Sequence, residues 1–178
     1  MLAMAVLSTA PRDAAAQNSE LVIHDYRAGL TGVRAANADV KLRVDRDSAQ
    51  GDEPVLMVEY PAPGADPAAR DVICDAANRD WTSGRAIAFR IRPSQAMRLS
   101  VSFVDRNRVV YTARTDLKAD VWQPIHIAFD EIRPNPYFQP PDAKRGAPLD
   151  VSDVRFIAFA PQDQTSGRLA ISKFTVIK

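Results

Sequence analysis

The fold is decided by three runs, Arg85-Ala-Ile-Ala-Phe-Arg-Ile91, Leu99-Ser-Val-Ser-Phe-Val-Asp105 and Trp122-Gln-Pro-Ile-His-Ile-Ala-Phe129. In each run the apolar residues fall on every second position. This period of two is typical of β-strands that have one buried face and one face in water. The three runs therefore predict antiparallel β-structure with an exposed sheet face.

Further strand candidates follow along the chain, separated by short turn signals and without a helical period of useful length. This pattern predicts one all-β domain over residues 17–178, folded as a two-sheet antiparallel β-sandwich. The additional strand candidates are Leu21–Tyr26, Val40–Val44, Pro54–Tyr60, Val72–Cys74, Arg108–Arg114, Val154–Phe159 and Leu169–Ile177.

Composition excludes several classes of partner. The chain has 178 residues, 25% of them charged, and a formal net charge of +1. Arginines are interleaved with aspartates, so no basic stripe of the kind that a phosphate backbone requires is present in the sequence. No run is long enough and apolar enough to cross a bilayer. We therefore expect neither a nucleic acid nor a membrane as partner.

The amino terminus has the pattern of an export signal. Met1–Ala10 is apolar, and Ala14-Ala-Ala16 before Gln17 satisfies the small-residue rule for signal-peptidase cleavage. The pattern predicts a signal peptide over residues 1–16 and a periplasmic or secreted protein; the alternative is an alanine-rich disordered tail. Cys74 is the single cysteine, so no internal disulfide can form, and its apolar strand setting predicts a buried thiol.

Residue parity assigns side chains to the exposed face. If Phe89 and Phe103 point into the core, then Arg90, Arg92 and Ser102 point outward. The same reasoning applied to the third run places Trp122 and His126 outward. A two-residue turn at Arg106 and Asn107 sets Tyr111 opposite Ser102. The resulting mixture of flat rings and fixed polar groups suits a polyhydroxylated ligand.

Residues 133–148 contain five prolines and cannot enter a sheet interior. Because Tyr137 and Phe138 favour packing, we expect an ordered loop across one end or face of the sandwich. The candidate ligand-binding residues are Arg90, Arg92, Ser102, Tyr111, Trp122, His126, Tyr137 and Phe138.

Catalytic patterns are weak. His24 and His126 are the only histidines, and neither a nucleophile elbow, nor a phosphate-binding glycine loop, nor a histidine metal motif occurs. Asp52-Glu53 and Asp130-Glu131 are sequence neighbours, and neighbouring strand residues point in opposite directions, so neither pair readily places two carboxyls face to face. We expect a protein without catalytic residues.

Several segments follow one another in an order that resembles the galactose-binding-domain-like jelly rolls. Within these, the chain is most similar to the family 11 carbohydrate-binding modules and to the related complex I intermediate-associated proteins. The resemblance covers about Leu21 to Lys178. The segments that carry it are Asp80-Trp81, Ile87-Ala-Phe-Arg-Ile91, Val101-Ser-Phe-Val-Asp105, Trp122–Phe129, Pro148-Leu-Asp-Val-Ser152 and Gly167-Arg-Leu-Ala-Ile171.

The resemblance implies a jelly roll whose concave face binds glycan chains in the carbohydrate-binding members. It also implies a structural calcium near the first and last strands, but Ser172 and Lys173 stand where an acidic ligand is expected. We therefore expect no cofactor, with a structural calcium as the open alternative. Our first hypothesis is a non-catalytic module that binds an oligosaccharide or polysaccharide. The alternative is a scaffold that binds another protein, through the same face or through the proline-rich loop. A glycoside hydrolase is a third possibility.

Overall fold

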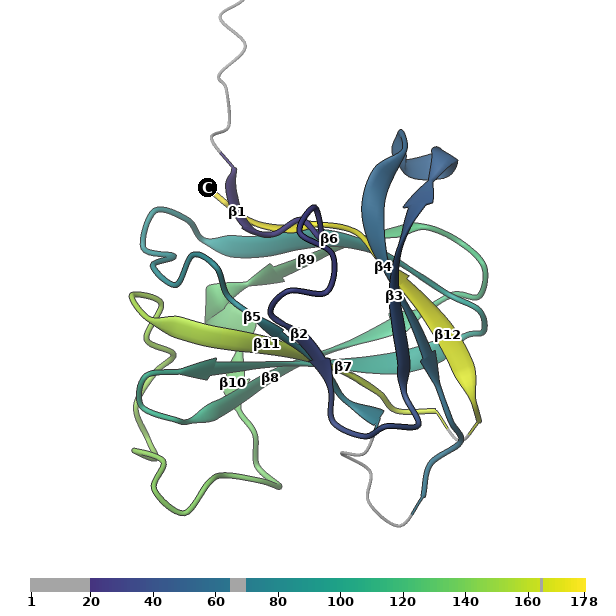
Figure 1. Ribbon diagram of the computed structural model, residues 1–178. Coiled ribbons are helices and arrows are strands. Elements are labelled where there is room, and N and C mark those ends of the chain that lie inside the picture. The colour runs from purple at the N-terminus through teal and green to yellow at the C-terminus, as the bar shows by residue number, and fades with distance from the viewer. Residues whose placement is uncertain (1–19, 65–69, 164) are drawn as a thin grey trace, which may run out of the picture.

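The computed structural model describes residues 20–64, 70–163 and 165–178, so the predicted signal peptide at 1–16 lies outside the described residues. The described chain forms two antiparallel β-sheets packed face to face (Figure 1). This arrangement confirms the predicted β-sandwich. Two short 3₁₀ turns lie within the described ranges, η1 (Ser48–Gln50) and η3 (Phe129–Glu131).

Seven strands of the described chain form the first sheet. Their order is β1-β13-β6-β12-β4-β3, and β9 pairs with the other side of β6. The bounds are β1 (Leu21–His24), β13 (Phe174–Ile177), β6 (Ala86–Pro93), β12 (Gly167–Ile171), β4 (Glu53–Tyr60), β3 (Lys41–Asp47) and β9 (Gln123–Ala128).

The prediction of one strand over Leu169–Ile177 was wrong, because β6 pairs with two strands in succession there, β12 and β13. The break falls at Ser172. Its N–H donates to the Arg90 carbonyl over 2.9 Å, and its hydroxyl accepts the Arg90 N–H over 2.8 Å. The serine side chain therefore replaces a backbone acceptor where the ladder changes partner.

Six strands form the second sheet in the order β10-β8-β7-β11-β5-β2. The short edge strands β2 and β10 were not predicted, because two or three residues carry no readable alternation. The bounds are β10 (Arg133–Pro134), β8 (Val110–Leu117), β7 (Met97–Asp105), β11 (Val154–Pro161), β5 (Val72–Asp75) and β2 (Val33–Ala35).

The core lies between the two sheets and follows the predicted parity on the central strands. Phe89, Phe103 and Ile127 are all buried there. Trp81 is fully buried, its indole N–H donates to the Asn78 carbonyl over 2.8 Å, and its ring stacks on Phe129 at a centroid distance of 6.0 Å. A buried indole whose polar end is satisfied stabilises the core without a desolvation penalty.

The predicted burial of Cys74 is also confirmed, since the residue lies fully within the core. Burial raises the pKa of the Cys74 thiol to about 12. Such a thiol stays neutral and is a poor nucleophile.

The prediction that Tyr111 points outward was wrong. The turn after β7 is longer than two residues, so Phe103 faces Tyr111, and Ser102 faces Thr112 instead. A shift of one residue moves a side chain to the opposite face of a strand, and Tyr111 is accordingly only 1% exposed. The longer turn depends on buried Asp105, whose carboxylate accepts the N–H groups of Asn107 and Asp150.

Candidate ligand-binding site

The outer face of the first sheet carries four of the eight predicted ligand-binding residues. Arg90 and Arg92 lie on β6, His126 lies on the neighbouring β9, and Trp122 immediately precedes β9. On β6 the alternating residues Ile87, Phe89 and Ile91 are buried between the sheets, so the two arginines project from the opposite side.

A bridge of three side chains, those of Asp47, Arg92 and Trp122, crosses this face, and we call it the Asp47 bridge. The carboxylate oxygen Oδ2 of Asp47 at the end of β3 lies 3.0 Å from the Arg92 guanidinium and accepts the Trp122 indole N–H over 3.3 Å. The Arg92 guanidinium carbon lies 5.2 Å from the centroid of the Trp122 ring. An ion pair, a hydrogen bond and a cation–π contact therefore join one edge of the sheet to the other.

The Asp47 bridge requires a strongly curved sheet. Strands β12 and β4 separate β6 from β3, a span of about 14 Å if the strands lay flat at about 4.8 Å spacing. Side chains can meet over such a span only if the sheet curls and its outer face becomes hollow. Val55 supports this conclusion: Leu56 and Val58 alternate into the core, yet Val55 on the outer side is only 1% exposed.

A groove of about 490 Å³, which we call the larger hollow, lies on the η1 side of the Asp47 bridge. The β3–β4 hairpin, which rises beyond β6 at the upper right of Figure 1, contributes Gln50 and Glu53 to it. Arg90 is exposed here, and its guanidinium has no hydrogen bond or ion pair with another described residue. The other lining residues are Glu20, Ala88, Phe89, Pro124, His126, Ser172, Lys173, Thr175, Ile177 and Lys178.

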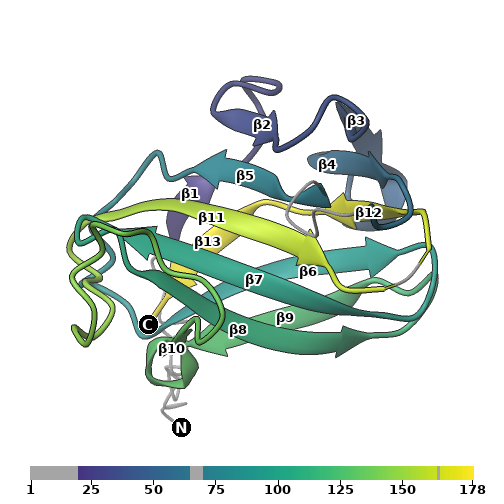
Figure 2. The same cartoon turned by 90° about the horizontal axis from the view of Figure 1, so that it is seen from below.

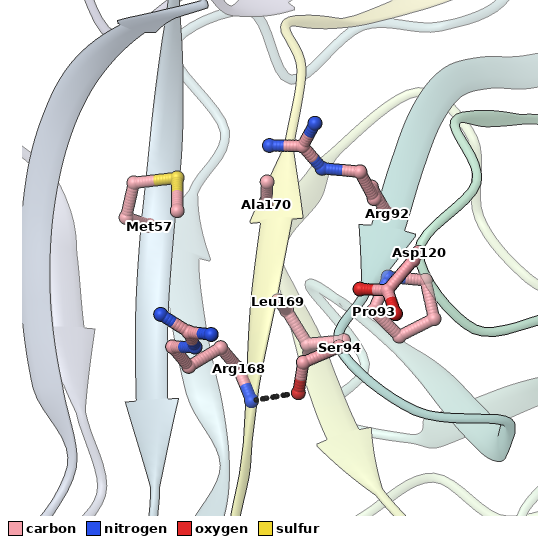
Figure 3. Close-up of a pocket in the computed structure, with 8 residues that line it drawn as sticks. All are labelled: Met57, Arg92, Pro93, Ser94, Asp120, Arg168, Leu169 and Ala170. Carbon is pink, nitrogen blue, oxygen red and sulfur yellow. Dashed lines mark hydrogen bonds between the residues drawn. The ribbon is translucent and has the colours of Figure 1, made fainter.

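A second groove of about 270 Å³, the smaller hollow, lies where the β6–β7 and β8–β9 turns meet β12. In Figure 3, Arg92 projects from β6 and Arg168 projects from the neighbouring β12, the strand that also carries the small Ala170. Ser94 accepts the Arg168 backbone N–H over 3.0 Å, which fixes the turn. Across the described ranges the Arg168 guanidinium pairs with no other side chain or carbonyl. The other lining residues are Met57, Pro93, Asp120 and Leu169.

The remaining predicted residues lie elsewhere. Ser102 is on the outer face of the second sheet, where its hydroxyl lies 3.3 Å from that of Thr112. Tyr111 lies in the core, where its hydroxyl donates to the Ala147 carbonyl over 2.8 Å, and burial raises its pKa to about 12. Tyr137 and Phe138 lie in the loop after β10 and are both exposed.

Sequence reasoning missed Asp47, Arg168 and Asp120. Arg168 could have been found, because it directly precedes the predicted strand Leu169–Ile177 and its neighbour Leu169 is buried, so that parity points Arg168 outward. Nothing local distinguishes Asp47 from the other charged residues of β3, since its role depends on the curvature of the sheet.

The described residues do not fit the calcium site that the family resemblance implies. Near the first and last strands the Lys173 ammonium lies 3.8 Å from the Glu20 carboxylate, so a cationic side chain already occupies this position. Throughout 20–64, 70–163 and 165–178 no three His, Cys, Asp or Glu side chains are grouped as a metal would require.

Comparison with known proteins finds solved structures that have the same fold. No family model matches the sequence, and no curated protein matches it. A family 11 carbohydrate-binding module from Clostridium thermocellum, solved with a β-1,3-1,4-mixed-linked tetrasaccharide, superimposes with a TM-score of 0.68 at 18% identity. This alignment covers 89% of this chain and 95% of that module.

Two further solved structures have the same fold. A family 30 module of a Clostridium thermocellum cellulosomal cellulase gives a TM-score of 0.57 at 14% identity, with 89% and 92% coverage. An exo-β-agarase gives 0.62 at 13% identity over 90% of this chain, but only 25% of the agarase is covered. At these identities the likeness establishes the jelly-roll β-sandwich alone. The described part of the chain contains no helix that is long and apolar enough to cross a membrane.

Proposed function

We propose that this chain is an exported, non-catalytic carbohydrate-binding module that holds an oligosaccharide or polysaccharide on the outer face of its first sheet. The observation that carries the proposal is the pair of hollows beside the Asp47 bridge, each of which presents an arginine without a described partner, Arg90 in one and Arg168 in the other. The jelly-roll neighbours that bind oligosaccharides add support from fold.

The chemistry of the two arginines suits sugar hydroxyls. A guanidinium has five N–H donors in a planar arrangement, and two of them can reach adjacent hydroxyl oxygens on one ring. Asp120 and Glu53 supply carboxylate acceptors at the rims of the smaller and larger hollow, respectively. The volume of the larger hollow lies within the usual range for small-ligand sites, roughly 300–1,000 Å³, and that of the smaller hollow lies just below it.

The test is affinity electrophoresis of the full chain in native gels that contain mixed-linkage β-glucan, xylan, xyloglucan, galactan or agarose. At least one polymer should retard the wild-type protein. Arg90→Ala and Arg168→Ala should each raise the dissociation constant for that polymer by about tenfold or more, because each removes charged hydrogen bonds. Absence of retardation in all five gels contradicts the proposal.

The matched control is Arg155→Ala. Arg155 is an exposed arginine on β11 of the second sheet, so its removal changes the net charge equally but leaves the proposed face intact. If Arg155→Ala weakened binding as much as the two test variants, general charge rather than the hollows would explain the loss. Reducing-sugar release from the retarding polymer tests the hydrolase alternative, and we expect none.

Export is tested separately by recovering the protein from the periplasmic or secreted fraction. The mature chain should begin at Gln17 by mass spectrometry, as the Ala14-Ala-Ala16 cleavage pattern predicts.

A second candidate function is a protein-assembly scaffold that uses the proline-rich loop. The observation that favours it is the exposure of two adjacent aromatic side chains, 81% for Tyr137 and 62% for Phe138. A pull-down from the exported fraction tests this candidate. A stoichiometric protein partner that is lost when both residues are changed to serine supports it.

A further inference from the structure

The loop after β10 holds its two exposed aromatic residues in a fixed place. Val110 on β8 is its main anchor: the Val110 carbonyl accepts the Asn135 N–H over 2.8 Å and the Gln139 amide over 2.7 Å, while the Val110 N–H donates to the Gln139 side chain. Farther along, the Lys144 N–H donates to the Asn107 carbonyl over 3.0 Å. These bonds tie the loop to the second sheet.

Within this loop, the Asn135 side chain accepts the N–H groups of both Tyr137 and Phe138. The Arg114 guanidinium carbon lies 5.5 Å from the centroid of the Tyr137 ring. The ring is therefore supported on one side by a cation while most of its surface stays in water. A fixed aromatic ring of this kind is ready to stack against a flat ligand without further ordering.

A chain of hollows leads from the proposed binding face to Arg114, whose guanidinium contacts the Tyr137 ring. The larger hollow shares Pro124 and His126 with a cleft of about 200 Å³ between β8 and β9. That cleft shares Arg114 and Glu131 with a groove of about 340 Å³ beside β10. Figure 2 shows β8 and β9 running side by side, with β10 close to one end of β8.

We propose that Tyr137 is a distal stacking subsite for a polysaccharide chain that leaves the larger hollow, crosses β9 at His126 and continues past Arg114. This inference rests on the proposed function and extends the binding surface from one sheet to the other. A pyranose ring would place its apolar C–H face on the Tyr137 ring, and the polar side chains along the path would bind the hydroxyls of the preceding sugars.

The polarity of the path favours a glycan over a protein as the occupant. Arg114, Thr115, His126, Glu131 and Arg133 line it, whereas the centre of a protein interface is usually apolar and depleted of charge. A single supported ring in a charged groove has the character of a sugar subsite.

The experiment compares Tyr137→Ala with wild type on each polymer of the five-polysaccharide panel that retards the protein, and on the tetrasaccharide of the same polymer. Binding of the polymer should weaken about fivefold, as expected for the loss of one stacking contact. Binding of the tetrasaccharide should not change, because a short ligand is held on the first sheet. Tyr137→Phe should bind the polymer as tightly as wild type does.

The control is Leu30→Ala, since Leu30 is an exposed apolar residue on the β1–β2 connection, away from the path. Polymer binding that survives Tyr137→Ala but is lost with Arg90→Ala overturns this inference and leaves the proposed function standing. Wild-type protein that binds no polymer overturns both. If Tyr137→Ala removes a stoichiometric protein partner and leaves polymer binding unchanged, the loop is a protein interface and the glycan path is wrong.

Discussion

The Asp47 bridge gives a quantitative prediction for the stability of the fold. Asp47→Ala removes the ion pair with Arg92 and the hydrogen bonds that the carboxylate accepts from the Trp122 indole and the Ala49 backbone N–H, and the Asp47 side chain is only 12% exposed. A hydrogen bond to a charged group contributes about 1.5–3 kcal/mol when well buried, and the partial exposure of Arg92 reduces this value. We expect the free energy of unfolding to fall by about 2 kcal/mol, or about 4–8 °C in Tm for a chain of this size.

A double-mutant cycle separates the bridge from other effects of the substitutions. Asp47→Ala, Arg92→Ala and the double variant are unfolded in urea, and the free energy of unfolding is extrapolated to water. The coupling energy between Asp47 and Arg92 should be about 1 kcal/mol, and 1 M salt should reduce it only partly because the carboxylate is mostly buried. A coupling energy below about 0.3 kcal/mol would refute the argument that these side chains hold the curved sheet together.

Three further predictions concern stability. Arg70 and Asp163 form an ion pair whose side chains are 4% and 10% exposed. Asp163→Asn leaves the buried Arg70 cation without its carboxylate, so the free energy of unfolding in urea should fall by about 3 kcal/mol. A fall of less than about 1 kcal/mol contradicts this prediction. Gly84→Ala should lower Tm by at least about 5 °C, since a Cβ there would overlap the Val176 side chain and lie 2.7 Å from the Ile177 carbonyl oxygen; an unchanged Tm contradicts this clash. Burial raises the pKa of the Cys74 thiol to about 12, so the folded thiol stays neutral while the unfolded thiol ionises above about pH 8.5. Stability should therefore fall by up to about 1.4 kcal/mol per pH unit between pH 9 and 11, and Cys74→Ala should remove that part of the slope.

The strands with strict alternation could be predicted from the sequence, together with the faces of their side chains. Phe103 and Ile127 are buried, and Arg90 and His126 are exposed, as parity requires. Local periodicity fixes these assignments because the side chains of a strand alternate whatever the strand pairs with.

Pairing and curvature could not be predicted in this way. The orientation of Tyr111 depended on the length of one turn, which the carboxylate of Asp105 sets through residues far along the chain. The contact of Asp47 with Trp122 depends on the curl of the whole first sheet. Both are long-range properties, and the candidate site was consequently only half recovered: the β6 and β9 side was found, whereas Asp47 and Arg168 were missed.

The most direct test of the central claim is an amide and arginine side-chain NMR titration with a tetrasaccharide of the polymer that retards the protein. Binding in the two hollows should give its largest shifts on the Arg90 and Arg168 guanidinium signals and on the backbone of β6, β9 and β12. Shifts that instead cluster around Ser102 and Arg155 on the second sheet would contradict it.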